Sequence, residues 1–238
     1  MHRVLVILIL VAAAAGTALA SGQQRGAGHD VDPDRLTHAF FRTVFGLEYG
    51  DHVDAHRVKR YVGPVRFHVV DYTGGMRDAD ARAFLENLPR RIRNLDTKVV
   101  DDPAAANFRV LLVPEAMFAN AVAAELKADA LAMNARCLVG VSTQAGRIRR
   151  STAVIVADDD FLFARCLVEE VLQGLGPMND DDGLAESVFN DTSRHAHFTK
   201  FDEALMNVLY HPLIRPGMTG SEAHRLLPVV LSDLGYTR

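Results

Sequence analysis

The stretch CLVEEVLQGLGPMND, residues 166–180, decides the fold because it sets adjacent glutamates just ahead of a glycine in a predicted helix. The helix is expected from about Phe161 to Gly174 or Leu175, with an aspartate at 158, 159 or 160 capping its first turn. The polar residues and the glycine recur at fixed intervals along the stretch: Glu169, Glu170, Gln173, Gly176 and Asn179. The simplest interpretation is a solvated acidic helix end closed by a glycine.

A second interpretation comes from the same spacing. The stretch resembles the HExxHxxGxxH motif of metzincin zinc proteases, with Glu170 at the general-base position and Gly176 at the helix-ending glycine. In those enzymes the three histidines bind zinc and the glutamate activates the bound water. Here Glu169, Gln173 and Asn179 stand at the three histidine positions. The resemblance therefore implies a zincin-like fold with a rewritten metal site.

Residues further along the chain follow the order found in matrixins, a branch of the metzincins. Phe189 falls at the position of the methionine whose turn passes beneath the metal, Asp202 at the start of the next helix, and Tyr210 at its end. In these enzymes, strands lead into the helix that binds the metal. The predicted hairpin that ends in STAVIVADD, at residue 159, has the corresponding place in this chain. The resemblance spans roughly residues 60–212, and its motifs lie in the last third.

The chain also resembles a family of exported bacterial proteins of unknown function. The shared residues are Cys166, Glu169, Glu170, Gln173, Gly176, Asn179, Asp180, Ser187, Phe189, Asn190, Asp191, Asp202, Leu209, Tyr210, Pro212, Gly217 and Met218. The resemblance implies a secreted or periplasmic protein, in which Gly176, Asp202, Tyr210 and Met218 have structural roles, but it supplies no activity.

The N-terminus predicts export. Residues 1–20 have one arginine, an apolar run and the ending Ala-Leu-Ala, which is typical of a cleaved signal peptide and leaves no membrane anchor. A flexible lead is expected over 21–34 and a single zincin-like domain over 35–238. Without Arg3, the chain carries 25 basic and 30 acidic residues, or net −5, which does not favour nucleic-acid binding. In an oxidising compartment the only two cysteines, Cys137 and Cys166, are expected to pair.

Hydrophobic periodicity predicts an α+β fold: a mixed twisted sheet, one long helix on it, and a helical C-terminal subdomain. Pro89 should kink or split the second of the predicted helices. The predicted elements are helices over 34–46, 77–95, 200–210 and 221–234, strands over 65–72 and 107–114, a helix or insertion over 117–133, and a hairpin of 137–143 with 147–159.

The residues at the histidine positions are poor zinc ligands. Glu169 could bind zinc, but the neutral amides of Gln173 and Asn179 are weak donors that add no charge. Without a metal, Glu170 would have no activated water to use. We therefore expect no zinc and no ordinary peptidase activity. Convergence of these side chains on one point would keep a metal possible.

Several functions remain open, among them a purely structural or adhesive role, which a structure without a groove over Glu170 would favour. The protein could be a pseudoenzyme whose groove, lined by Glu169, Glu170 and Gln173, binds a peptide or another cell-envelope component. It could hold a hard cation such as calcium through Glu169 with Asn179, Asp180 or Asp191. It could also be a hydrolase of peptide or glycan at Glu169 and Glu170 that uses an atypical metal, or a metal-free one that uses two carboxylates. For that chemistry Glu170 would need Asp180 or Asp191, because Glu169 and Glu170 should point about 100° apart on a helix.

Overall fold

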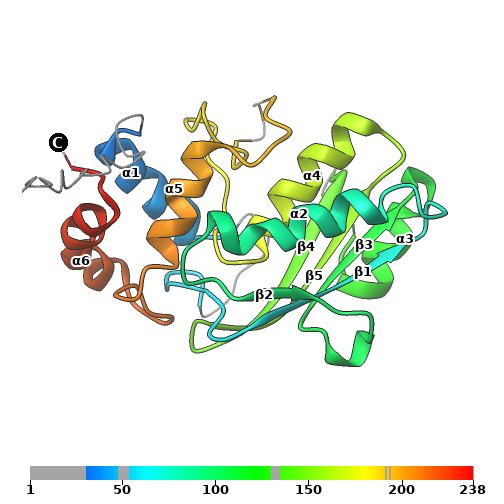
Figure 1. Cartoon of the computed structure of the whole chain (residues 1–238), viewed down its shortest axis with the longest axis horizontal. Helices are drawn as coiled ribbons and strands as arrows, with labels where there is room; N and C mark the ends of the chain where they lie inside the picture. Colours follow the sequence, from blue (N-terminus) through cyan, green and yellow to red (C-terminus); the bar gives the residue numbers. More distant parts are fainter. Residues whose placement is uncertain (1–30, 48–53, 130–134, 191, 193, 238) are drawn as a thin grey trace, which may run out of the picture.

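A computed structural model describes residues 31–47, 54–129, 135–190, 192 and 194–237, and within them five strands form one mixed sheet with six α-helices around it (Figure 1). The strands are β1 (Val65–Asp71), β2 (Thr97–Val99), β3 (Phe108–Val113), β4 (Cys137–Gln144) and β5 (Arg147–Val156). The helices are α1 (Pro33–Val44), α2 (Asp78–Arg91), α3 (Glu115–Leu126), α4 (Asp160–Gln173), α5 (Lys200–Leu209) and α6 (Gly220–Leu234). The predicted α+β class is confirmed.

The N-terminal predictions lie largely outside the described residues. This holds for the signal peptide over 1–20 and for most of the lead over 21–34. Helix α1 begins at Pro33 because Asp32 accepts a hydrogen bond from the Asp34 N–H and Pro33 fits the first helical position. The fold therefore starts slightly before the predicted residue 35. None of the described helices is long and apolar enough to cross a lipid bilayer.

The sheet has the strand order β2-β1-β3-β5-β4. The pairs β1 with β2, β1 with β3 and β3 with β5 are parallel, whereas β4 runs antiparallel to β5 at one edge. The predicted hairpin is confirmed, and its turn consists of Ala145 and Gly146, which both have positive φ angles of 53° and 75°. The sequence analysis missed β2, which has only three residues.

Alternate residues of the central strands enter two separate cores. Phe108, Val110 and Leu112 of β3 pack with the residues of α2 and α4 on one face. Leu111 and Val113 pack with α3 on the other face. Because successive side chains of a strand point to opposite faces, a run of apolar residues such as FRVLLV is required where both faces are covered.

Helices α1, α5 and α6 form a second part of the fold beside the sheet (Figure 1). The C-terminal helices α5 and α6 each begin with a capping box, in which a threonine and an acidic residue three positions later exchange hydrogen bonds with the backbone. The predicted helical C-terminal part is present, and it also includes the N-terminal α1, which the sequence analysis did not expect there.

Pro89 does not split helix α2, which continues to Arg91. Proline removes the N–H that would bond to the carbonyl four residues earlier, here that of Leu85. The hydroxyl of Thr97, from the next strand, lies 3.5 Å from that carbonyl oxygen. Pro89 is also only two residues from the end of the helix, so it interrupts little of it.

A buried lysine holds the loop between α1 and β1 against the end of α4. Lys59 is only 1% exposed, and its Nζ donates to the carbonyl oxygens of Val44, Ala55 and Arg57 at 2.8, 3.0 and 3.1 Å. A Cβ added to Gly176, whose φ is 150°, would lie 2.4 Å from the Lys59 carbonyl oxygen. Only glycine therefore allows this loop to lie directly against the chain leaving α4.

Lys59 makes the stability depend on pH above neutrality. Burial lowers the pKa of the Lys59 amine to about 8, and the nearby charge of Asp54 acts in the opposite direction. In the unfolded chain the pKa of this amine is about 10.5. Between these values the unfolded state binds more protons, so the free energy of unfolding should rise with pH. From pH 7.5 to 9.5 the rise should reach up to about 2 kcal/mol more in the wild-type protein than in Lys59→Met, measured by urea denaturation. Parallel pH profiles would contradict this.

Candidate functional site

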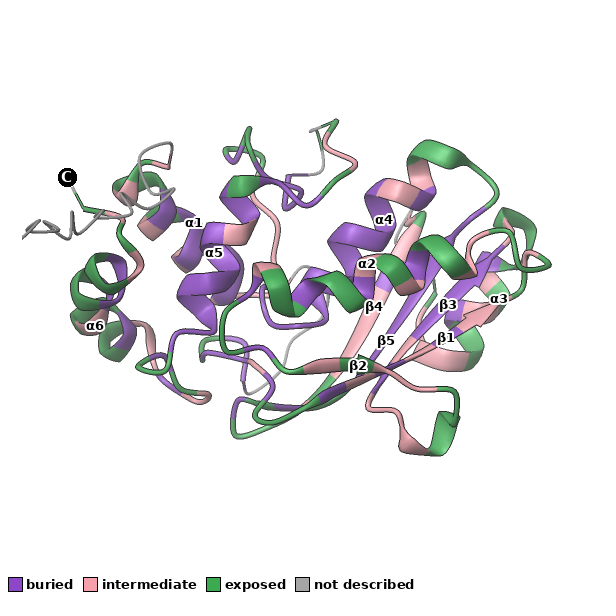
Figure 2. Cartoon of the chain, viewed as in Figure 1, coloured by how far each residue is buried: buried purple, intermediate pink, exposed green. Residues whose placement is uncertain are grey.

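Helix α4 carries the candidate site and is buried along most of its length (Figure 2). Asp159 caps it by accepting a hydrogen bond from the Leu162 N–H, as one of the three candidate aspartates was expected to do. Every residue from Arg165 to Met178 is buried. Glu169 and Glu170 are each 5% exposed. The interpretation of this stretch as a solvated acidic helix end is therefore wrong.

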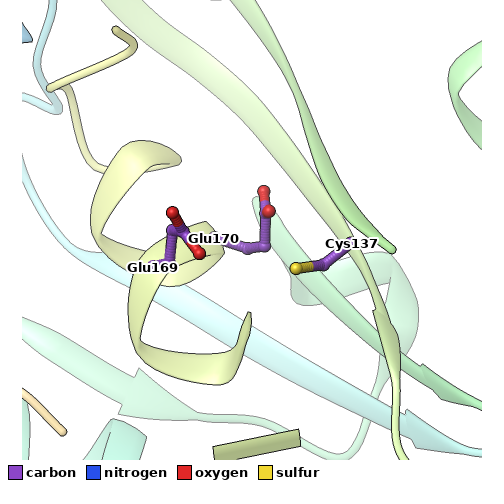
Figure 3. Close-up of side chains that lie close together, drawn as sticks. All are labelled: Cys137, Glu169 and Glu170. Atoms are coloured by element: carbon purple, nitrogen blue, oxygen red, sulfur yellow. The ribbon is translucent and has the colours of Figure 1, made fainter. Parts of the chain in front are cut away.

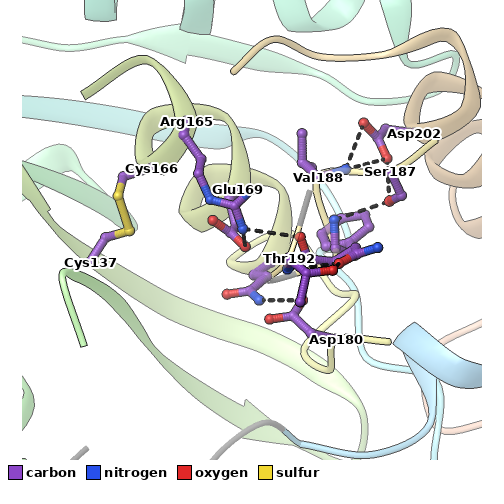
Figure 4. A network of polar contacts seen from close by, with 12 residues as sticks. Cys137, Arg165, Cys166, Glu169, Asp180, Ser187, Val188, Thr192 and Asp202 are labelled. Carbon is purple, nitrogen blue, oxygen red and sulfur yellow. Dashed lines mark hydrogen bonds and ion pairs between the residues drawn. A yellow bond between two sulfur atoms is a disulfide. The ribbon is translucent and has the colours of Figure 1, made fainter. Parts of the chain in front are cut away.

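An ion pair lies inside the fold at this point (Figure 4). The guanidinium of Arg165 lies 3.1 Å from Glu169 Oε1, one helical turn away, and donates at 3.2 Å to the carbonyl oxygen of Asn190. The two side chains are 10% and 6% exposed. Charged groups are rarely buried to this extent unless they are paired, because leaving water costs each of them several kcal/mol. The sequence analysis did not single out Arg165.

The two glutamates also approach each other and a sulfur atom (Figure 3). One ligand atom from each of Cys137, Glu169 and Glu170 lies within 4.8 Å of the others. The expectation that these adjacent glutamates do not readily form the catalytic pair of a carboxylate hydrolase stays a prediction, because the closeness of two oxygen atoms does not by itself make that arrangement. Their Cα–Cβ bonds do diverge on the helix, but a glutamate side chain has enough rotatable bonds to turn its carboxylate back toward its neighbour.

Cys137 and Cys166 form the predicted disulfide, with their Cα atoms 5.8 Å apart (Figure 4). It joins the first residue of β4 to the middle of α4. The bond uses the sulfur that lies near the two carboxylates, and a disulfide sulfur is not the thiolate that binds zinc. The cluster of Cys137, Glu169 and Glu170 therefore does not fit a zinc ion while the bridge is intact.

The three residues at the histidine positions engage different partners. Glu169 pairs with Arg165, and Gln173 Nε2 donates to Asp180 Oδ1 at 3.0 Å. The amide of Asn179 donates to the carbonyl oxygen of Arg42, in α1, at 2.9 Å. These hydrogen bonds use amide N–H groups, whereas a hard cation would bind oxygen atoms, so the hard-cation site that joins Glu169 to Asn179 or Asp180 stays a prediction. Asp191, the other candidate ligand, lies outside the described residues.

The segment that contains Phe189 packs against α4 and the loop that follows it. Phe189 is fully buried, and its carbonyl oxygen accepts a hydrogen bond from the Asp181 N–H at 2.9 Å. The next residue, Asn190, receives the hydrogen bond from Arg165. One hydrogen bond therefore joins this turn to Arg165 in α4, and the other joins it to Asp181 in the loop after α4. The neighbouring Asp180 accepts the hydrogen bond from Gln173.

Asp202 anchors the other side of the same turn. Its carboxylate accepts hydrogen bonds from the hydroxyls of Ser187 and Thr199 at 2.6 and 2.7 Å and from the backbone N–H of Val188. Burial raises the pKa of Asp202, and these hydrogen bonds act against that shift. The carboxylate thus fixes the start of α5 to the Phe189 turn.

Tyr210 and Met218 hold the C-terminal part against the end of α4 and the loop before β1. The Tyr210 hydroxyl donates to the Leu175 carbonyl oxygen at 2.9 Å, and the Arg60 guanidinium lies 4.5 Å from the centre of the Tyr210 ring. The carbonyl oxygen of Met218 accepts a hydrogen bond from the Val58 N–H at 2.8 Å. Both residues therefore make contacts that fit the structural roles implied by the resemblance.

The opposite side of α4 borders a cleft. A pocket of about 430 Å³ lies between α2, α4 and residues 196–198. A second pocket of about 550 Å³ shares Arg91, His197 and Phe198 with it and also includes His195. The His195 and His197 rings meet edge to face at 5.7 Å. The carboxylates of Glu169 and Glu170 are not among the residues that line these two pockets.

These features define an α+β protein whose sheet-covering helix carries a buried ion pair beside a disulfide. The chain belongs to the family described as "Protein of unknown function (DUF2927)", whose model matches residues 33–229. No curated protein and no solved structure matches the chain.

The Arg165–Glu169 pair should be the most sensitive polar contact of α4. Arg165→Met leaves the Glu169 carboxylate buried without this cation and should lower the free energy of unfolding by about 3–5 kcal/mol in urea denaturation. The double variant Arg165→Met/Glu169→Leu should lose less than the sum of the two single variants. As a control, Arg42→Met removes a pair with Asp181 whose arginine side chain is 56% exposed, and it should cost at most about 1 kcal/mol. Equal losses in Arg165→Met and Arg42→Met would contradict the assignment.

Proposed function

We propose that the protein is an exported, zincin-like non-peptidase in which an internal arginine has taken the place of the metal, and that it binds an extended peptide or another cell-envelope component. The observation that carries the proposal is the contact between Arg165 and Glu169. Glu169 stands at the first zinc-ligand position of the resembling motif, and its nearby positive charge is a guanidinium of the same chain.

Several arrangements support the zincin-like part of the proposal. The hairpin of β4 and β5 leads directly into α4, and the Phe189 turn packs against the buried end of that helix. Asp202 lies at the start of α5, and Tyr210 caps its end. These are the landmarks that the sequence shares with the matrixins, in the same order, and here they come together in space.

Charge balance supports the loss of the metal. Two adjacent buried carboxylates need a positive charge nearby, since their mutual repulsion is strong in a medium of low dielectric constant. Arg165 provides that charge from one helical turn away. A divalent ion at Glu169 would face repulsion from this fixed cation. The polar residues of α4 would then serve to hold the scaffold rigid.

The edge strand β4 is the surface that we assign to peptide binding. It is the last strand of the sheet, and no other described strand pairs with its outer edge. Extended peptides bind such edges by adding a strand, with main-chain hydrogen bonds for affinity and side-chain contacts for specificity. Val139 and Val141 are half-buried, while Ser142 and Gln144 are exposed, so β4 offers both apolar and polar contacts.

A carboxylate-only hydrolase is the second candidate. The approach of Glu169 and Glu170 within 4.8 Å favours it, since retaining glycosidases use carboxyl groups about 5–5.5 Å apart. In such an enzyme Glu170 would act as the acid or base. The low exposure of both side chains and the ion pair of Glu169 make this function the weaker of the two.

Metal analysis tests the first proposal. Protein purified without chelator should contain zinc far below one ion per chain, and it should not cleave a generic peptide library, with or without added chelator. Stoichiometric zinc or chelator-sensitive cleavage would overturn the non-peptidase proposal. Cleavage of peptide or cell-wall glycan that resists chelator and disappears in Glu170→Gln would establish the carboxylate hydrolase instead.

Peptide binding is tested separately. Peptides selected from a random library on the wild-type protein should slow hydrogen exchange of the backbone amides of β4, because strand addition gives those amides new partners. Exchange in α6, which lies in the other part of the fold, serves as the internal control and should not change. Protection confined to residues outside β4 would place the binding surface elsewhere.

A further inference from the structure

Several large apolar side chains are exposed near the carboxyl ends of the parallel strands. Seven such residues are exposed in the described part of the chain, and four of them are Tyr72, Met76, Met117 and Phe161, which are 48%, 65%, 43% and 48% exposed. We call these four residues the edge patch. Isolated exposed apolar residues are ordinary, but a group of them on neighbouring loops marks an interaction site.

The topology explains why these residues lie together. β1, β3 and β5 are adjacent and parallel, and near their ends Asp71 pairs with Leu112, which pairs with Ile155. The chain therefore leaves all three strands at their carboxyl ends, on the same side of the sheet, where α2, α3 and α4 begin (Figures 1 and 2). Tyr72 and Met76 lie in the first connection, Met117 in the first turn of α3, and Phe161 in the first turn of α4.

Hydrogen bonds join these connections into one rigid platform. Arg77 Nε donates to the Ala157 carbonyl oxygen at 3.0 Å, and its guanidinium pairs with Asp160. The Glu115 N–H donates to the carboxylate of Asp158 at 3.1 Å. All three connections are thus held relative to one another, so a partner would lose little conformational entropy of this surface on binding.

The charge around the edge patch is negative. The three arginines nearby, Arg77, Arg82 and Arg136, already pair with Asp160, Asp78 and Glu115. Further carboxylates lie on the same connections, and the acidic residues of this edge are Asp71, Asp78, Asp80, Glu115, Asp158, Asp159 and Asp160. Acidic side chains therefore outnumber basic ones around an apolar centre, and a complementary partner would be basic.

From this arrangement we infer that the edge patch is a docking site for a partner protein that presents apolar side chains flanked by lysine or arginine. The apolar centre would supply most of the binding energy, and methionine and aromatic side chains are common at such centres. The carboxylates would select the partner and speed its association. They would also repel the phosphate groups of a membrane surface. The inference uses residues other than β4 and does not depend on the proposed peptide site.

A model peptide tests the inference. The probe is a fluorescein-labelled amphipathic helix of leucine and lysine, about 18 residues or five turns long. In fluorescence anisotropy it should bind the wild-type protein, and Met76→Ser/Phe161→Ser should weaken binding about tenfold or more. The matched control is Val62→Ser/Val229→Ser, which removes apolar side chains that are 54% and 50% exposed elsewhere and should change binding less than about twofold. A peptide with glutamate in place of lysine should not bind.

Methyl NMR of the wild-type protein locates the contact without any substitution. The methionine methyl signals of Met76 and Met117 should shift on peptide addition, whereas that of Met206, which is fully buried, should not. Equal weakening in the control variant, equal binding of the glutamate peptide, or unshifted Met76 and Met117 signals would overturn the inference. Sedimentation of the wild-type protein with phosphatidylcholine vesicles, lost in Met76→Ser/Phe161→Ser, would also overturn it, because the patch would then bind lipid.

Discussion

The ion pair of Arg165 and Glu169 is the constraint on which the surroundings of α4 depend. The helix must be buried to join the sheet to the C-terminal helices, yet it carries two adjacent carboxylates on its buried part. Arg165, one helical turn from Glu169, supplies a positive charge beside these carboxylates and also donates to the Asn190 carbonyl oxygen. One side chain therefore compensates buried charge and fixes the Phe189 turn in the same place.

Cationic side chains also donate hydrogen bonds to backbone carbonyl oxygens where the sheet meets the helices. Lys59 donates to backbone carbonyl oxygens at the end of α1 and in the loop after it. Arg60 donates at 2.8 and 3.1 Å to the carbonyl oxygens of Leu209 and His211. These carbonyl groups lie in loops and at helix ends, and a buried carbonyl group that lacks a donor is costly. A buried lysine and a half-buried arginine supply the donors, so the loop geometry depends on charged side chains as well as on apolar packing.

The fold was largely predictable because its signals are local. The alternation of residues 65–71, the double-sided apolar run of 108–113 and the glycine turn at 146 each follow from short-range patterns. The buried polar network was not predictable in this way. Arg165 and Glu169 are spaced like an ordinary surface ion pair of a helix, and only packing from the Phe189 turn and the sheet removes them from water. The three residues of β2 carry too little pattern to detect.

Under the proposed function, a metal-bound ancestor and this arginine-stabilised chain would need the same framework for different reasons. A metal fixes its ligands by coordination, whereas a guanidinium is attached to the helix and must be positioned by packing. In this chain the disulfide from Cys137 to Cys166 and the carboxylate of Asp202 hold the segments on either side of the polar stretch. The disulfide and the Asp202 carboxylate are not members of the Arg165–Glu169 ion pair. These supports hold α4 and its buried glutamates in place.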